Sequence, residues 1–207
     1  MRIGVFGGSF NPIHLGHLIA AECCREQRSL DRVLFVPAAT PPHKQGHSLA
    51  AAQQRLEMVS LAIGGHESFA VSSLEIDRGG VSYTVDTLAT LATAHPAAEL
   101  HLILGPDAVR QLVTWKDPAR IAALARLVAV ERDGVDDIAA AVRDGRLSDL
   151  VGSNVAENLV DSRVRMPAIG IRASDLRSAV AAGRSIRYRT PRAVERFIET
   201  HGLYRSG

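Results

Sequence analysis

The 207-residue sequence predicts an α/β fold built on a mainly parallel, doubly wound sheet, and three features of the chain support this. Short runs rich in valine, isoleucine, leucine and phenylalanine alternate with longer amphipathic stretches, as in successive βα units. The runs are apolar throughout, which is typical of strands covered on both faces of a sheet. Glycine, proline or polar residues bound each run. Because no repeat, low-complexity tract or linker interrupts this pattern, we expect one domain spanning residues 1–207.

Five of these runs are predicted to be strands. Each is short, and in chain order they are Ile3–Phe6, Arg32–Val36, Phe69–Leu74, Leu100–Leu104 and Leu127–Val130. Residues 144–169 are the least periodic part of the chain, so the sequence predicts no element there.

The stretches between the runs are predicted to be helices. Leu88, Leu91 and Ala92, for example, have the i, i+3, i+4 spacing of a buried stripe. The predicted helices are Leu15–Arg28, Ala50–Ile63, Thr84–Ala94, Ala108–Leu112 and Asp136–Arg143, followed by a helical C-terminal segment of Ser174–Ala182 and Pro191–His201. For the last helix, Thr190 is predicted to be the N-cap, and Gly202 to end it. The domain is therefore expected to be Rossmann-like, with helices on both faces of the sheet.

The composition places the chain among soluble globular proteins, with 46% hydrophobic and 22% charged residues. No apolar run is long enough to span a bilayer, and Met1–Phe6 is too short and glycine-interrupted for a secretory signal. We therefore expect a cytoplasmic location and no membrane partner. The two cysteines, Cys23 and Cys24, are adjacent, which favours small apolar helix residues over a disulfide or a metal site.

The charge of the chain is unevenly distributed, although the net charge is only +2. Ten arginines lie from Arg163 onward, and such a segment could bind RNA, hold a polyphosphate or form a solvated face. Aromatic residues make up only 4% of the chain, which argues against a stacking platform for single-stranded nucleic acid. We therefore expect no nucleic-acid partner.

The segment that follows the first predicted strand indicates a phosphate site. It reads Gly7-Gly8-Ser9-Phe10-Asn11-Pro12-Ile13-His14-Leu15-Gly16-His17 and continues into a predicted helix. The two glycines let backbone N–H groups approach a phosphate closely. His14 and His17 lie at the helix start, where free N–H groups and the helix dipole favour anions. A glycine turn with two surface histidines is the alternative, but H-x-G-H after a Gly-Gly strand exit favours function.

Two common phosphate-binding patterns are absent from the sequence, namely G-x-x-x-x-G-K-[ST] and G-x-G-x-x-G. Neither a P-loop nor the standard dinucleotide fingerprint therefore explains the predicted site.

At these residues the chain resembles nucleotidyltransferases of the H-x-G-H type, and within them bacterial nicotinate-nucleotide adenylyltransferases. The resemblance covers nearly the whole chain. It comprises Gly7–His17, Val36-Pro37, Pro41–Lys44, Gly80–Leu88, Leu104–Asp107, Trp115, Ile171–Arg177 and Ser185–Tyr188. H-x-G-H marks only the superfamily, whereas Ser82–Thr87 with Trp115 indicates this member.

The resemblance implies transfer of the adenylyl group of ATP to nicotinate mononucleotide, which yields deamido-NAD and pyrophosphate. His14 and His17 would be the catalytic pair. The implied ATP-binding residues are Gly7, Gly8, Ser9, Phe10, His14, Gly16, His17, Gly105, Asp107, Ile171, Ser174 and Arg177. The implied acceptor-binding residues are Lys44, Tyr83, Thr84, Trp115 and Arg132. Mg²⁺ is expected to bind mainly through the substrate phosphates and not in a protein cage, and a homo-oligomer is left open.

Several of these residues have structural alternatives. Lys44 could be a solvated loop lysine, and Trp115 a core residue, although its polar neighbours favour a half-exposed position. Asp107 could cap a helix, and Arg132 could pair with Glu131 or Asp133.

The chain departs from the family pattern at three positions. Arg172 replaces a small hydroxyl residue, Asp175 adds a negative charge, and Lys116 follows Trp115 where a tyrosine is common. Ser174 still offers a hydroxyl at the predicted helix N-cap, and Arg177 offers a cation one turn later, so both could serve the ATP phosphates.

Two other functions remain open at this point. The first is adenylyl transfer to another phosphate acceptor, namely nicotinamide mononucleotide, phosphopantetheine or a flavin nucleotide. The second is a non-catalytic nucleotide-sensing or RNA-binding module, which the basic C-terminal third would support.

Overall fold

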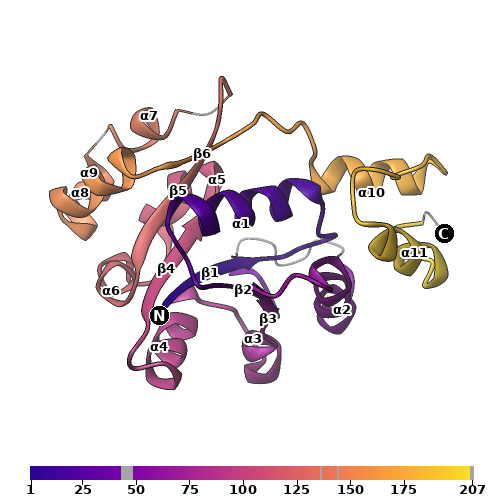
Figure 1. Ribbon diagram of the computed structural model, residues 1–207, viewed down its shortest axis with the longest axis horizontal. Helices are drawn as coiled ribbons and strands as arrows, with labels where there is room; N and C mark the ends of the chain where they lie inside the picture. Colours follow the sequence, from indigo (N-terminus) through magenta and orange to yellow (C-terminus); the bar gives the residue numbers. More distant parts are fainter. Residues whose placement is uncertain (43–48, 136, 144, 206–207) are drawn as a thin grey trace.

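The computed structural model describes residues 1–42, 49–135, 137–143 and 145–205. Within these ranges the chain forms a parallel sheet with the strand order β3-β2-β1-β4-β5-β6, which confirms the predicted doubly wound fold (Figure 1). The strands are β1 (Arg2–Gly8), β2 (Arg32–Pro37), β3 (Phe69–Val71), β4 (Glu99–Leu104), β5 (Arg126–Arg132) and β6 (Val164–Met166).

Helices cover both faces of the sheet and form two separate hydrophobic clusters. On one face lie α1 (Leu15–Gln27), α2 (Ala52–Ile63), α10 (Ala173–Ala181) and α11 (Arg192–Thr200). The other face carries α4 (Thr84–Ala94), α5 (Pro106–Gln111), η2 (Leu112–Thr114), α6 (Pro118–Leu124), α7 (Ile138–Val142), α8 (Arg146–Val151) and α9 (Ser153–Asp161). The short helix α3 (Leu74–Arg78) follows β3. Figure 1 shows α10 and α11 together at one end of the molecule and α8 and α9 at the other.

Two predicted segments need correction. The third strand ends at Val71 and Leu74 begins α3, because the Ser72 hydroxyl accepts from the Leu74 N–H at 3.3 Å and the chain turns there. The weakly periodic segment, for which no element was predicted, contains α8, α9 and β6.

Helix α6 was not predicted, although its start has a clear local signal. Asp117 caps it by accepting from the Arg120 N–H, and Pro118 occupies its first position. An Asp-Pro pair is a known start signal for a helix, so the sequence did contain this information.

The last helix begins one residue later than predicted. Pro191 is its N-cap, while the Thr190 hydroxyl donates to the Ile13 carbonyl oxygen at 2.8 Å. Gly202 has a φ of 60° directly after the C-cap, as expected for the residue that ends a helix. Thr190 therefore connects the C-terminal segment to the loop after β1.

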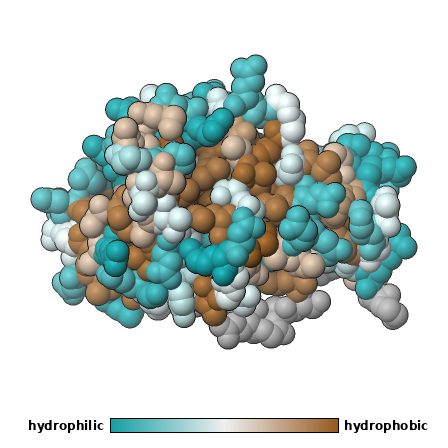
Figure 2. Space-filling view, turned by 90° about the horizontal axis from the view of Figure 1, so that it is seen from below, coloured by the Kyte–Doolittle hydropathy of each residue, from teal (hydrophilic) through white to brown (hydrophobic). Residues whose placement is uncertain are grey.

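The described helices include none that is long and apolar enough to cross a membrane. Hydrophilic side chains are spread across the face seen in Figure 2 and interrupt its apolar areas. Cys24 is fully buried in α1, and this burial raises the pKa of its thiol to about 12. Both cysteines lie in α1 and pack in or against the hydrophobic cluster of that face, in agreement with the prediction of small apolar helix residues.

Candidate active site

The candidate site lies where β1 and β4 end at the centre of the sheet. The chain runs from β1 outward to β2 and β3, and β4 then returns to the other side of β1. In such sheets the loops after the two central strands diverge and leave a crevice in which ligands bind. Gly7 and Gly8 end β1, and Gly105 follows β4. The predicted phosphate segment and Gly105 therefore meet at the carboxyl-terminal edge of the sheet, where the central strands β1 and β4 end.

The glycines at this edge differ in whether the surrounding packing requires a residue without a side chain. A Cβ added at Gly7 or Gly105 would meet no atom of the described chain within 4 Å, so protein packing does not require glycine there. A Cβ at Gly8 would lie 3.2 Å from the Phe10 ring. That ring is 2% exposed and packs in the core with Phe6 and Phe35. Of Phe10, only the backbone is thus suited to the predicted ATP contact.

The two histidines form a stacked pair at the start of α1. Their ring centroids are 3.7 Å apart, and the planes differ by 26°. His14 is the N-cap, and its backbone N–H donates to Nδ1 of His17 at 3.2 Å. Because Nδ1 of His17 accepts this bond, the proton of the neutral ring is on Nε2. His17 therefore presents an N–H donor on the side of the ring away from the helix cap.

Burial keeps the other histidine neutral. His14 is 7% exposed, and this burial lowers the pKa of its imidazole to about 4. At neutral pH it can offer a phosphate one N–H donor without contributing a positive charge.

Gly16 is required by the packing of this pair. A Cβ at Gly16 would lie 3.1 Å from both Cε1 and Nδ1 of His14, closer than a side chain normally approaches. The glycine of the H-x-G-H motif therefore makes room for the His14 ring.

Gly16→Ala is accordingly expected to lower activity without lowering stability. Alanine favours the helix by up to about 1 kcal/mol over glycine, which offsets the local strain. Displacement of the His14 ring should reduce kcat/KM for ATP on the order of tenfold to a hundredfold. Steady-state kinetics and thermal melts would check this, with Gly64→Ala as the control because its Cβ would make only ordinary contacts at 3.6 Å. An unchanged kcat/KM in Gly16→Ala would contradict the role of Gly16.

The buried histidines also predict how stability depends on pH. Burial lowers the pKa of His101 in β4 as it does that of His14. Both groups bind a proton more readily in the unfolded chain, where histidine has a pKa of about 6.5. Their contribution is present above about pH 6.5 and is lost as the pH falls toward the folded-state value, about 4 for His14.

The free energy of unfolding should therefore decrease between about pH 6.5 and pH 5, before most carboxylates titrate. For His14 the full loss is on the order of 3 kcal/mol. Urea titrations across this range would measure the decrease, and His101→Leu should flatten it. The same slope in wild type and in His101→Leu would show that His101 does not contribute.

The C-terminal segment holds the loop between β1 and α1 in place. Arg177 donates through Nη1 to the Asn11 carbonyl oxygen at 2.8 Å, and the Tyr204 hydroxyl donates to Asn11 Oδ1 at 2.7 Å. The Leu15 N–H also donates to the Arg189 carbonyl oxygen at 3.0 Å. Thr190 and Tyr204 were not among the predicted site residues, and Asn11 lay in the predicted segment without an assigned role, because local sequence does not reveal contacts over more than 160 positions. Arg177 thus reaches the predicted phosphate segment.

The other predicted residues of the C-terminal motif lie nearby but play different local roles. Arg172 is the N-cap of α10, so Ser174 lies within the first turn and is not the predicted cap. The exposed Ser174 hydroxyl donates to the Asp175 carboxylate at 3.1 Å. Ile171 is half-buried and packs against the cluster that includes α1.

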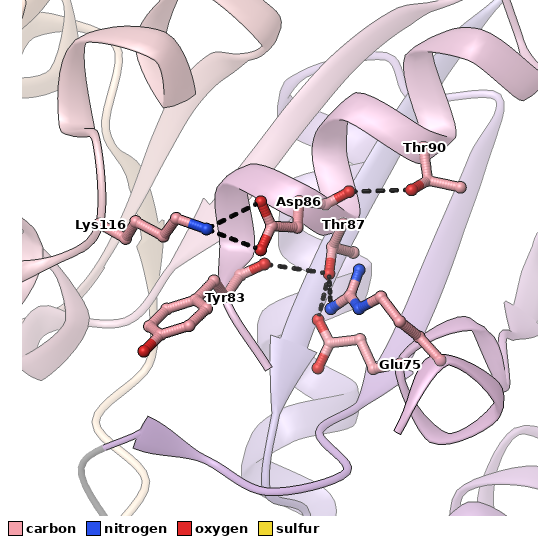
Figure 3. Close-up of polar contacts among 7 residues, drawn as sticks. Glu75, Tyr83, Asp86, Thr87, Thr90 and Lys116 are labelled. Carbon is pink, nitrogen blue, oxygen red and sulfur yellow. Dashed lines mark hydrogen bonds and ion pairs between the residues drawn. The ribbon is translucent and has the colours of Figure 1, made fainter. Parts of the chain in front are cut away.

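Two of the predicted acceptor residues, Tyr83 and Thr84, lie at the start of α4, and Figure 3 shows Tyr83 there. Tyr83 is the N-cap of this helix and Thr84 its first residue, and both are half-buried. The N–H groups of a first helical turn have no acceptor within the helix and favour an anion. Lys116 lies over the Tyr83 ring, with Nζ 4.7 Å from the centroid, and pairs with Asp86 at 3.1 Å. A cation, an aromatic ring and a helix N-terminus therefore come together here.

A buried network braces the same helix. The Thr87 hydroxyl donates to Glu75 Oε1 at 2.6 Å, and Thr87 also accepts from Arg78 at 3.2 Å (Figure 3). Glu75 is only 6% exposed, so this bond supports α4 from α3.

The remaining predicted residues have mixed placements. Trp115 is half-buried, as expected, and packs against the same cluster as Tyr83. Asp107 lies within the first turn of α5 and pairs with Arg110, whereas Gly105 is the N-cap, so the helix-cap alternative for Asp107 is wrong. Arg132 ends β5. Lys44 lies outside the described residues.

The donors at this edge suit phosphate better than a bare metal ion. In the described part of the chain, no three or more His, Cys, Asp or Glu side chains are grouped as metal ligands. The site instead offers imidazoles, a guanidinium and helix N-termini, which are donors for anions.

This fold and this site define a nucleotidyltransferase of the cytidylyltransferase-like class, whose family model matches residues 5–179. A probable nicotinate-nucleotide adenylyltransferase of Thermus thermophilus is 47% identical over 205 residues, covering 99% of this chain and 100% of the relative. Another from Thermomicrobium roseum is 43% identical, covering 99% and 92%. The chain belongs to the nicotinate-nucleotide adenylyltransferase family.

Solved structures agree with this fold. The Plasmodium falciparum nicotinic acid mononucleotide adenylyltransferase complexed with NaAD superposes with a TM-score of 0.75 at 17% identity, covering 98% of this chain and 97% of the other. A putative nicotinate-nucleotide adenylyltransferase from Vibrio parahaemolyticus gives a TM-score of 0.69 at 20% identity, covering 100% and 96%. At such identities the comparison supports the architecture alone.

Proposed function

We propose that the chain transfers the adenylyl group of ATP to the phosphate of nicotinate mononucleotide in NAD biosynthesis. The observation that carries the proposal is that the residues after β2 join two candidate sites, because the Ala38 N–H donates to the Gly8 carbonyl oxygen and the Ala39 N–H to the Ser82 hydroxyl, each at 2.9 Å. One is the Gly7–His17 segment, with its stacked histidines. The other is the N-terminus of α4, with Tyr83 and Lys116.

The reaction needs alignment and anion donors more than covalent chemistry. A phosphate oxygen of nicotinate mononucleotide attacks the α-phosphorus of ATP, and the bond to the β-phosphate oxygen breaks as pyrophosphate leaves. The leaving pyrophosphate gains negative charge in this step. The Nε2–H of His17, the neutral ring of His14 and the N-terminus of α1 are the groups proposed to stabilise it.

Arg177 and Ser174 are proposed to contact the outer ATP phosphates. Arg177 already lies against the segment after β1 through its bond to Asn11. A guanidinium has five N–H donors, so a second donor group of Arg177 can serve a phosphate while the first holds the loop.

The acceptor is proposed to bind at the start of α4. The carboxylate of nicotinate is an anion, which the first-turn N–H groups of Thr84 and Val85 favour over a neutral amide, while the Lys116 ammonium is already paired with Asp86. Tyr83 and Trp115 offer flat aromatic surfaces for the pyridine ring. This arrangement supports nicotinate over nicotinamide mononucleotide as the acceptor.

Mg²⁺ is proposed to accompany ATP through its phosphates. Among the described residues, no three or more His, Cys, Asp or Glu side chains are grouped so that they could hold the ion by themselves. The imidazoles and Arg177 suit phosphate oxygens instead. Bound in this way, the ion would neutralise phosphate charge during transfer.

The test is to incubate the protein with ATP, Mg²⁺ and one acceptor at a time, and to measure pyrophosphate and dinucleotide. Nicotinate mononucleotide should give the highest kcat/KM, ahead of nicotinamide mononucleotide, phosphopantetheine and a flavin nucleotide. A higher value for any other acceptor would overturn the assignment. ATP binding without pyrophosphate from any acceptor would favour a non-catalytic nucleotide-sensing module.

A further inference from the structure

Arg55 is a buried cation beside the site that the proposed reaction does not yet use. It lies in the first part of α2 and is 1% exposed. Burying a guanidinium costs free energy unless its N–H groups are hydrogen-bonded, so the groups to which Arg55 donates indicate its role.

The Arg55 guanidinium donates to three main-chain carbonyls from three different segments. Nη1 donates to Ser9 at 2.9 Å, Nη2 to Ala39 at 3.0 Å and Nε to Ala50 at 3.0 Å. Its planar fork of donors fits such a set, whereas a lysine ammonium has no comparable geometry.

These carbonyls belong to both halves of the site. Ser9 lies in the phosphate segment after β1, and Ala39 follows β2. The Ala39 N–H donates to the hydroxyl of Ser82 at 2.9 Å, and Ser82 directly precedes Tyr83. A single side chain therefore connects the backbone of the ATP half to that of the acceptor half.

The third carbonyl, that of Ala50, connects the Arg55 hydrogen bonds to the contacts that Arg177 and Tyr204 make with Asn11. The Ala50 N–H donates to Asn11 Oδ1 at 3.1 Å, the same oxygen that accepts from the Tyr204 hydroxyl. Asn11 in turn accepts from Arg177 through its carbonyl oxygen.

We propose that Arg55 is a positioning residue for adenylyl transfer, which fixes the phosphate segment at Ser9 relative to the acceptor side at Ala39. This inference rests on the proposed function. Arg55 acts through the backbone and not by contact with substrate. Without it, the Ser9 and Ala39 carbonyls lose these donors and the two halves can shift relative to each other. Displacements near 1 Å between reacting groups can cost about a hundredfold in rate.

The test compares Arg55→Ala, Arg55→Lys and, as control, Arg120→Ala, which removes an exposed arginine of α6 outside the site. Circular dichroism and thermal melts identify temperatures at which each variant is folded. Both Arg55 variants should then show kcat lowered about a hundredfold, with smaller changes in either KM, while Arg120→Ala matches wild type.

Chemical rescue separates positioning from a general loss of structure. Guanidinium at low millimolar concentration should restore part of the kcat of Arg55→Ala in a saturable way and leave wild type and Arg120→Ala unchanged. Ammonium should not rescue it. If Arg55→Ala does not fold, Arg55→Lys carries the test through its low kcat at wild-type circular dichroism.

Three results would overturn the role of Arg55. One is a kcat within twofold of wild type in the folded Arg55 variants. The second is a loss of kcat that is seen only at temperatures at which the variant is partly unfolded. The third is a folded Arg55→Ala whose kcat guanidinium does not restore. If wild type itself yields no product, the proposed function fails. ATP binding by calorimetry then tests Arg55, with guanidinium-reversible weakening expected in Arg55→Ala and unchanged binding counting against it.

Discussion

Replacing His17 by alanine should lower kcat by roughly a hundredfold to a thousandfold, because it removes a donor that matters mainly in the transition state. The corresponding cost is about 3 kcal/mol, as for other donors aimed at developing charge. The alanine variant also loses the acceptor for the His14 N–H, which is part of the α1 cap. Its melting temperature should therefore fall slightly as well.

His17→Gln separates these two effects. Glutamine at the third helical position can accept from the N-cap N–H, as in a capping box, but provides no imidazole. We expect a near-wild-type melting temperature and a kcat that stays at least roughly a hundredfold low. Stopped and continuous pyrophosphate assays would measure the kcat of both variants, and thermal melts their melting temperatures. Recovery of wild-type turnover in His17→Gln would mean that His17 only caps α1.

Trp115→Ala should weaken the binding of the acceptor and leave the binding of ATP nearly unchanged. Stacking of a base on an aromatic side chain contributes about 1 to 3 kcal/mol, so the KM for nicotinate mononucleotide should rise roughly fivefold to a hundredfold or more. Trp115→Phe keeps a flat ring and should lose much less. The KM for ATP serves as the internal reference in each variant.

The half-buried position of Trp115 makes the alternative testable in the same experiment. Because Trp115 also packs against the cluster of the second face, a structural role would weaken both substrates together. Equal increases in the KM for ATP and for the acceptor, along with a lower melting temperature, would assign Trp115 to the core.

The sequence predicted the elements whose signals are local. Continuous apolar runs gave β1, β2, β4 and β5 to within two residues, and the periodic stretches gave α1, α2 and α4 with similar accuracy. The three-residue β6 and the short helices α8 and α9 were not predicted. Their stability comes from neighbours, since β6 pairs with β5, and strands this short carry almost no pattern.

The chemical character of the site was also readable from the sequence. Glycines after a strand and two histidines at a helix start are local features, so they predict the phosphate segment Gly7–His17. The family was indicated by the resemblance at Ser82–Thr87 and Trp115. The assignment of Ser174 as a helix cap was wrong, since Arg172 is the N-cap of α10 and the helix starts two residues earlier than the cap prediction implied.

The amino-acid sequence by itself determined the α/β architecture, because apolar runs and helical periodicity are local properties, and its motifs determined the family. The phosphate role of Gly7–His17 is predicted from the same local residues. Only the tertiary structure decided that His14 is neutral, that Lys116 lies over Tyr83 and that Arg55 joins Ser9 to Ala39. Burial, stacking and hydrogen bonds between distant segments exist only after the strands have ordered side by side, so no local pattern encodes them.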